Sequence, residues 1–413
     1  MKCSIYLLLL TCLLLAPSAA MAQHDSGQQS YELTLDQALA LARAQAPSID
    51  IARARIDEAR ANRQTADIVL RSNPTLEIGA GPRISADRTT TDVDISIAQS
   101  FGVGRQRGAR LVVADAEIEL RTADADNVLR ELLYGVAVAF LRTQYADQRL
   151  RIATDTEALT ATLVRVAEER LRVGDANRLD LNLAELARMR VQSDIQLRTS
   201  EREEAVSELR RLIGLEAGAD IIVSGDLLHR PTFDLSALQA RSEDRADLRA
   251  LDAEARVAEN EAALARKLAL PEFGVRLGYG REELSNILMG AISFTLPVFN
   301  RGQGAEAGAL ARENALRIEY HAAQRTIADT LRTAFDRYER LRTAVDAFER
   351  AGTASIDQSN ALALQSYESG NLPLVELLSI QRELVEARVA HADLLLATAL
   401  ARVALEASAG VIQ

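Results

Sequence analysis

Two acidic side chains stand at matching places in this sequence, and their type and spacing make them the first candidates for chemistry. Asp180 follows Gly174 by six residues, and Glu376 follows Gly370 by six. Each glycine interrupts a long helical pattern, so each carboxylate falls near the start of a new helix, where the helix dipole favours an anion in any case. Carboxylates that are brought close together repel one another and favour bound cations. Asp180 and Glu376 are therefore either a cation-attracting group or two ordinary solvated residues.

No other residues have the spacing of a catalytic or metal site. The four histidines, His24, His229, His321 and His391, form no ligand pattern, and the sequence has no H-E-x-x-H motif and no Cys/His set. It also has no nucleophile–base pair, no Walker motif and no Rossmann glycine pattern. We predict a protein that is not an enzyme and that holds no cofactor and no resident metal.

The elements that must position the two carboxylates are unusually long helices. The chain of 413 residues has no Trp, 4% aromatic residues and only 8 Pro. No proline lies between Pro82 and Pro231, or between Pro297 and Pro373. Since proline disrupts helix interiors, these spans leave room for very long helices. The net charge of −11 argues against a nucleic-acid partner.

The N-terminus predicts export. Lys2 precedes an apolar core over residues 5–15, and Ala20-Met21-Ala22 is a small-residue cleavage site. We predict that residues 1–22 are a signal peptide cleaved after Ala22. Cys12 follows a weak lipoprotein-like sequence with an unfavourable Thr11, so lipidation at Cys12 is the alternative to an unlipidated mature chain.

Two pairs of segments with period-two alternation predict strands, and long helical patterns follow each pair. Each half reads helix, two strands, very long helix, glycine turn, long helix, which predicts a duplicated, mainly α protein with a small β part. The first repeat covers residues 23–214, with strands about 74–82 and 91–101 and long helices about 105–172 and 176–213. The linker covers 215–245, and the second repeat covers 246–413, with strands about 271–280 and 286–299 and long helices about 304–368 and 372–408.

The exits from strand to helix support the duplication, because a phenylalanine and a glycine occur at both; the residues concerned are Phe101, Gly104, Pro297, Phe299 and Gly302. Four strands cannot close a barrel, and an open edge in a bilayer leaves backbone groups without partners. The strands have the length of about ten residues that crosses a bilayer when tilted. We therefore expect several chains to share one closed barrel, and three chains would give twelve strands.

The whole arrangement resembles the outer membrane efflux protein (TolC) family. The resemblance is carried by Tyr367-Glu368-Ser369-Gly370, by its partner turn at Gly174, by the two exits and by the tandem repeat. It implies a homotrimer with a 12-stranded barrel in outer-membrane lipid, continuous with a periplasmic α-helical barrel of coiled coils. It also implies that the linker joins an equatorial collar. The partners implied are a periplasmic adaptor (membrane fusion) protein and an inner-membrane pump of the resistance-nodulation-division type.

Within that family the chain is similar to the CzcC-like branch of heavy-metal cation ducts. Pro297-Val298-Phe299-Asn300-Arg301-Gly302-Gln303-Gly304 and Ser72-Asn73-Pro74-Thr75-Leu76-Glu77 carry this similarity, and both are structural turns. A duct for drugs or for type I protein secretion is the alternative within the family. A coiled-coil structural protein of the envelope, without a pore, is the alternative from another class.

The resemblance also implies roles for particular residues. Asp180 and Glu376 would line the periplasmic mouth of the pore, whereas the family's second acidic position, nine residues after the second glycine, is Ser379 here. Gly174, Gly370 and Tyr367 would form the hairpin turns. Leu179, Leu181, Leu374 and Leu377 are candidates for docking the adaptor, and packing within the coiled coil is the alternative for them.

Overall fold

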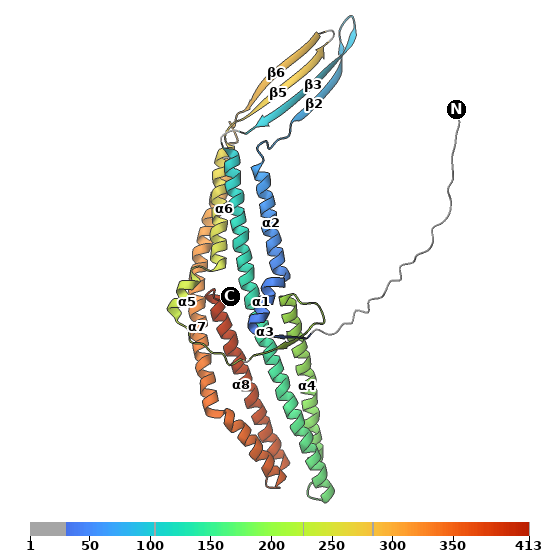
Figure 1. Cartoon of the computed structure of the whole chain (residues 1–413), viewed down its shortest axis with the longest axis vertical. Helices are drawn as coiled ribbons and strands as arrows, with labels where there is room; N and C mark the ends of the chain where they lie inside the picture. The colour runs from blue at the N-terminus through green and yellow to red at the C-terminus, as the bar shows by residue number, and fades with distance from the viewer. Residues whose placement is uncertain (1–29, 103–104, 226, 283–284, 413) are drawn as a thin grey trace, which may run out of the picture.

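The computed structural model describes residues 30–102, 105–225, 227–282 and 285–412. The molecule is a long rod, with a four-stranded sheet at one end and the tips of two helical hairpins at the other (Figure 1). The prediction of a mainly helical chain with a small β part is confirmed.

The elements occur in the same order in both halves. The first half contains β1 (Ser30–Leu33), α1 (Leu35–Gln45), α2 (Pro47–Asp67), β2 (Thr75–Ile84), β3 (Thr89–Phe101), α3 (Gln106–Val173) and α4 (Arg178–Ile213). The linker contains β4 (Asp220–Val223) and α5 (Leu235–Ser242). The second half contains α6 (Ala246–Leu268), β5 (Glu272–Glu282), β6 (Ser285–Thr295), α7 (Gln303–Glu368) and α8 (Leu374–Ser408).

Local chemistry explains where several of these elements begin and end. Thr34 caps α1 through a capping box with Gln37. Helix α2 starts at Pro47, whose missing N–H is harmless in a first turn, and no side chain of the described residues caps it. Strand β6 ends at Thr295 rather than near 299, because Pro297 cannot donate to a ladder.

The two longest helices form the rod. Helix α3 has 68 residues and α7 has 66, which at about 1.5 Å per residue makes each about 100 Å long. Helix α3 is covered by α2 on the sheet side and by α4 on the tip side, and α7 is covered in the same way by α6 and α8 (Figure 1).

The sheet joins the two halves. Its strand order is β2-β3-β5-β6, all antiparallel, so the central pairing of β3 with β5 brings the first repeat against the second. The linker also contributes a short strand. Strand β4 pairs in parallel with β1, from Ser30 opposite Asp220 to Leu33 opposite Val223, a contact between segments about 190 residues apart.

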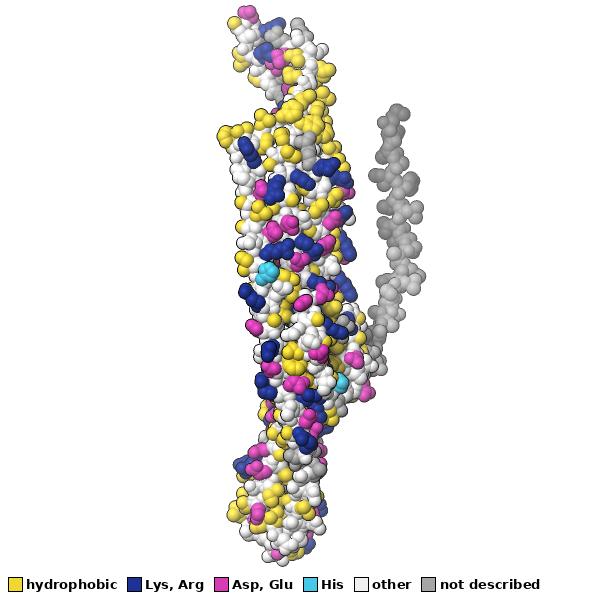
Figure 2. All heavy atoms as spheres, turned by 90° about the vertical axis from the view of Figure 1, so that its left-hand side faces the viewer, with side chains coloured by type: hydrophobic (Ala, Val, Ile, Leu, Met, Phe, Trp, Pro, Cys, Tyr) yellow, Lys and Arg dark blue, Asp and Glu magenta, His cyan; other side chains and the backbone are white. Residues whose placement is uncertain are grey.

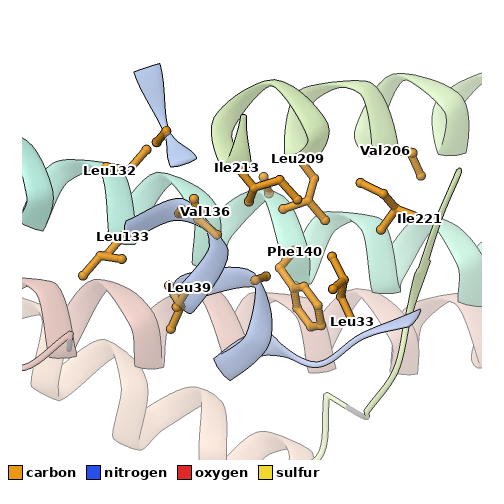
Figure 3. Packing of buried hydrophobic residues seen from close by; sticks show 14 of the residues in the cluster. Leu33, Leu39, Leu132, Leu133, Val136, Phe140, Val206, Leu209, Ile213 and Ile221 are labelled. Atoms are coloured by element: carbon orange, nitrogen blue, oxygen red, sulfur yellow. The ribbon is translucent and has the colours of Figure 1, made fainter. Parts of the chain in front are cut away.

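The largest hydrophobic cluster lies at mid-height, where the linker meets the first half. Val136 and Phe140 of α3 pack against Leu209 and Ile213 of α4, and Ile221 of β4 is fully buried beside them (Figure 3). This cluster fixes the linker and the N-terminal strand against the helical rod.

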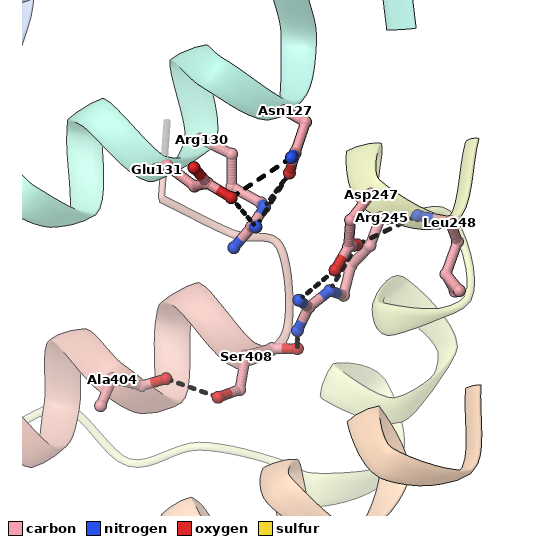
Figure 4. Close-up of polar contacts among 8 residues, drawn as sticks. All are labelled: Asn127, Arg130, Glu131, Arg245, Asp247, Leu248, Ala404 and Ser408. Atoms are coloured by element: carbon pink, nitrogen blue, oxygen red, sulfur yellow. Dashed lines mark hydrogen bonds and ion pairs between the residues drawn. The ribbon is translucent and has the colours of Figure 1, made fainter. Parts of the chain in front are cut away.

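A buried arginine fastens the second half at the same height. The Arg245 side chain, 10% exposed, donates to Asp247 Oδ1 at 3.0 Å and Oδ2 at 2.7 Å. Its Nη1 also donates to the backbone carbonyl of Ser408 at 2.8 Å (Figure 4). The start of α6 is thereby held to the end of α8.

Candidate functional site

One face of the sheet is apolar and exposed. The register aligns Phe101, Phe273 and Phe294 in one row, and Ile78, Ile95, Tyr279 and Leu288 in another. Leu288 is 84% exposed and Ile292 is 69% exposed. Figure 2 shows hydrophobic side chains gathered on the lower part of the sheet and where it meets the helices. Water-soluble proteins rarely leave such a continuous apolar surface uncovered, so this face needs an apolar environment.

The opposite face is polar over β2, β3 and β5, whereas β6 adds Ile287 and Met289 to it. Glu77, Ser96 and Gly278 share one row, and Asp94 lies between two glycines in the next. Arg276 pairs with Glu77 at 3.3 Å across this face. An alternation that separates apolar from polar side chains over ten or more residues suits a strand between lipid and water.

Both outer strands have an unpaired edge within the single chain. Within the residues that the structure describes, β2, of 10 residues, and β6, of 11, each pair with one neighbour only. Unpaired backbone N–H and C=O groups of this length invite another strand, and in a bilayer they require one.

Among the helices of the described residues, none has the length and hydrophobicity needed to cross a bilayer. The same part of the chain contains no cluster of three or more His, Cys, Asp or Glu residues that suits a metal ion.

At the first hairpin tip, the candidate carboxylate has a structural partner. Gly174 ends α3 in the left-handed conformation with φ 81°. Asn177 then caps α4, and its side chain accepts from the Asp180 N–H at 2.9 Å. The Asp180 carboxylate in turn accepts from the Asn177 N–H at 3.3 Å. Asp180 therefore belongs to a capping box.

At the second tip, the candidate carboxylate has no such partner. Gly370 forms the turn with φ 80°, and α8 begins after Pro373. Glu376 is exposed in the first turn of α8, and within the described residues no hydrogen bond or ion pair involves its carboxylate. Of the two sequence candidates, Glu376 is thus the one whose charge faces solvent freely. Ser379, on the same helix, is also exposed.

The residues predicted to dock a partner separate into two groups. Leu374 is 4% exposed and Leu377 is 0% exposed, and both pack with Tyr367 in a cluster that joins the two hairpins. Their side chains pack the tip instead of forming its surface, because they lie on the face of α8 that meets α7. Leu179, by contrast, is 62% exposed.

Sequence reasoning missed Arg170, which links the two tips. Its guanidinium lies over the Tyr367 ring at 5.3 Å and donates to the Tyr367 carbonyl at 3.3 Å. It also pairs with Asp175 at 2.9 Å. The sequence position gives no signal for this role, because Arg170 is one arginine among many on α3, and only the fold brings Tyr367 within its reach.

The predicted exits lie at the junction between sheet and helices. Phe101 stacks on Phe273 with ring centroids 4.9 Å apart. Gly302 has φ 73° and precedes α7, and a Cβ there would lie 3.0 Å from a carbonyl of α6. Pro297 follows the end of β6, and Phe299 is 92% exposed. Gly104 lies outside the described residues.

These features define a class, that of membrane-inserted proteins with a long helical stem. They are an exposed apolar sheet face, unpaired strand edges, and two long helical hairpins that each end in a glycine turn. The comparison with protein families is specific. The model of the "Outer membrane efflux protein" family matches residues 38–215 and 237–411. The chain therefore belongs to the outer membrane efflux protein family, as its sequence suggested.

Two characterised relatives are similar over much of the chain. The cobalt-zinc-cadmium resistance protein CzcC of Cupriavidus metallidurans is 24% identical over 402 residues, which is 92% of this chain and 93% of the relative. The nickel-cobalt-cadmium resistance protein NccC of Alcaligenes xylosoxydans xylosoxydans is 26% identical over 309 residues, 72% of this chain and 69% of the relative.

Solved structures share the fold. The outer-membrane channel OprN matches with a TM-score of 0.73 at 19% identity, covering 91% of this chain and 89% of that one. CusC, solved in a study of transmembrane channel formation, matches with a TM-score of 0.71 at 21% identity, covering 91% and 92%. The open state of the Neisseria gonorrhoeae MtrE channel matches with a TM-score of 0.72 at 18% identity, covering 91% and 89%.

Proposed function

We propose that the protein is a passive outer-membrane exit duct, built from three copies of this chain, in a tripartite efflux system for heavy-metal cations. The observation that carries the proposal is the sheet with one exposed apolar face and two unpaired edges. Pairing β6 of one copy with β2 of the next would satisfy both edges, and three copies would close a sheet of twelve strands. The apolar face would then meet lipid, and the polar face would line water.

The helices would continue this passage into the periplasm, with the linker at residues 215–245 forming part of a collar around it. Substrate would be supplied by an inner-membrane pump of the resistance-nodulation-division type through a periplasmic adaptor. The duct would need no catalytic step of its own, since a conduit must release what it carries.

The tip is the proposed gate. In a threefold assembly, Glu376 would supply three free carboxylates around the mouth. Charges closer than the Debye length of about 8–10 Å repel one another and are relieved by a bound cation. Asp180 is the other candidate for this group of carboxylates, but it also caps the start of α4 through its capping box with Asn177.

Planar-bilayer conductance tests the gate. A trivalent cation such as hexamminecobalt should block the native trimer from the periplasmic side, and Glu376→Gln should weaken that block by tenfold or more. Glu368→Gln is the matched control, because Glu368 is exposed at the same tip and also has no charged partner in the described residues. Unchanged block in Glu376→Gln would remove Glu376 from the gate.

Docking of the adaptor is proposed for the exposed end of the first hairpin. Leu179→Ser should reduce cysteine crosslinking to the adaptor while the yield of trimer stays normal, because Leu179 contributes little to packing. Leu374→Ser should instead reduce the yield, because Leu374 is buried. Normal crosslinking in Leu179→Ser would place the docking surface elsewhere.

The choice of heavy-metal cations as substrate rests on the two relatives named for cobalt, zinc, cadmium and nickel resistance. Deleting the gene in a strain without redundant ducts should lower tolerance to these cations, and the native gene should restore it. Sensitivity to drugs or detergents, with unchanged tolerance to metals, would reassign the duct to those substrates.

Export is part of the proposal. Cleavage after Ala22 predicts a mature chain that begins at Gln23 and carries no lipid. The intact mass of the protein purified from outer membranes checks both statements, since a lipid on Cys12 would leave residues 12–22 in place and add the mass of the acyl groups.

A further inference from the structure

A small cleft lies where the sheet meets the helices, and residues of both halves line it. It has a volume of about 80 Å³, and Arg71, Arg107, Arg110 and Glu272 are the charged side chains that line it. A water molecule occupies about 30 Å³ in the liquid, so the cleft has room for a group of a few heavy atoms. Three guanidinium groups around so small a space favour an anion with several oxygen atoms.

The three arginines are not equally occupied by the protein. Arg107 binds the Asp67 carboxylate and donates to the Asp67 carbonyl at 2.8 Å. Arg110 uses one nitrogen to reach the carbonyl of Ile68 at 3.3 Å. Arg71 is exposed and has no hydrogen bond or ion pair within residues 30–102, 105–225, 227–282 and 285–412. Arg71 and the remaining donors of Arg110 are therefore available to a ligand.

The charged side chains around the cleft carry a net positive charge that one negative charge on a ligand would balance. Three arginines against Glu272 and Asp67 give an excess of one positive charge. Helix α3 begins beside the cleft with no acidic residue in its first turn, so its dipole adds to the positive potential. A phosphodiester carries a single negative charge at neutral pH and matches this balance.

The rim of the cleft is apolar and exposed. Val69 is 72% exposed and Leu268 is 44% exposed, and both line the cleft. Their neighbours Leu70 and Leu270 are 47% and 42% exposed. On the face that Figure 2 shows, hydrophobic side chains also gather where the sheet meets the helices, and Lys and Arg side chains lie just beyond them on the helices. A soluble anion would leave this rim in water, whereas a lipid would cover it.

We propose that the cleft binds the phosphate of a phospholipid in the periplasmic leaflet of the outer membrane, with the acyl chains lying along Val69, Leu70 and Leu268. The inference rests on the proposed position of the sheet in the membrane. Arg71 and Arg110 would hold the phosphate oxygens, and Arg107 would keep the end of α2 in place. The lipid would thereby fix the depth at which the helical stem leaves the bilayer.

Lipid binding to the purified, delipidated trimer tests the proposal, with native mass spectrometry as the readout. Phosphatidylglycerol should bind at least about tenfold more tightly than a diacylglycerol with the same chains, because charge-assisted hydrogen bonds contribute on that scale. The double variant Arg71→Gln, Arg110→Gln should lose that preference. Arg301→Gln should keep it, because Arg301 is exposed at the corresponding junction of the second half, outside the cleft.

Three outcomes would overturn the inference. Equal losses in the double variant and in Arg301→Gln would mean a general attraction of lipid to cations. Binding of glycerol 3-phosphate as tight as that of phosphatidylglycerol would mean a site for soluble phosphate. Absence of phosphatidylglycerol binding would mean that the cleft is closed in the trimer. Conductance of the same preparation in planar bilayers separates these failures from failure of the proposed duct.

Discussion

The contact between Arg245 and Asp247 predicts a large and local loss of stability when the arginine is removed. Arg245→Ala leaves the Asp247 carboxylate without two donors and the Ser408 carbonyl without one. The arginine side chain is 10% exposed and the aspartate side chain 29%. Breaking a buried pair by removing one partner costs about 3–5 kcal/mol, and the partial exposure of Asp247 places this pair near about 3 kcal/mol.

The chain offers a matched control with the same bidentate geometry at the surface. Arg211 donates to both carboxylate oxygens of Glu208, at 2.9 Å and 2.6 Å, but its side chain is 67% exposed. Exposed pairs contribute little to stability, because both groups are well solvated without each other. Arg211→Ala should therefore have little effect.

Hydrogen exchange measures both variants on the assembled protein. A loss of about 3 kcal/mol corresponds to roughly 100-fold faster opening, so amides in the last turns of α8 should exchange that much faster in Arg245→Ala. Arg211→Ala should accelerate exchange at the end of α4 by less than about fivefold. Similar accelerations in the two variants would refute the argument that burial, rather than geometry, decides the strength of these pairs.

Three further predictions follow from single contacts. Burial alone would raise the pKa of Asp247, but the hydrogen bonds and charge of Arg245 lower it. The stabilisation from this contact is therefore complete above the ordinary pKa of 3.8 and is lost as the pH falls through the lowered pKa. Hydrogen exchange of the α8 amides, measured across an acid titration, checks this. Tyr338→Phe removes a buried hydrogen bond of 2.7 Å to a linker carbonyl and should cost about 1–3 kcal/mol in denaturant unfolding, whereas Tyr134→Phe, 38% exposed, should cost almost nothing. Gly174→Ala should lower the free energy of unfolding by about 1–2 kcal/mol, because an alanine at this positive φ is strained. Gly214→Ala should lower it clearly more, because its Cβ would also lie 2.5 Å from a carbonyl of α1. Equal shifts of the melting temperature in the two variants would contradict this.

Patterns that depend on neighbours in the sequence predicted most of the architecture. Alternation along residues 74–101 and 271–282 places apolar and polar side chains on opposite faces, and the register keeps these faces separate across β2, β3 and β5, whereas β6 carries apolar side chains on both faces. The glycine turns follow from the same local physics, since Gly174 and Gly370 both take the left-handed conformation.

Contacts between distant segments could not be predicted in this way. The parallel pairing of β1 with β4 joins two four-residue strands that carry almost no periodic signal of their own. The role of Arg170 requires the end of α7 to come within reach of its side chain at the tips, and the burial of Leu374 and Leu377 depends on which face of α8 meets α7. Local hydrophobicity identifies such leucines but does not say whether a neighbouring helix or a partner covers them.

The residue three positions before each candidate carboxylate nevertheless accounts for the difference between them. Asn177 has a side chain that caps α4 and a backbone N–H that Asp180 can accept from, so the two residues form a reciprocal pair. Pro373 has no N–H, and so Glu376, at the same helical position, has nothing to accept from at the cap. One helix start therefore holds its carboxylate in place, and the other leaves its carboxylate exposed to solvent without a partner among the described residues.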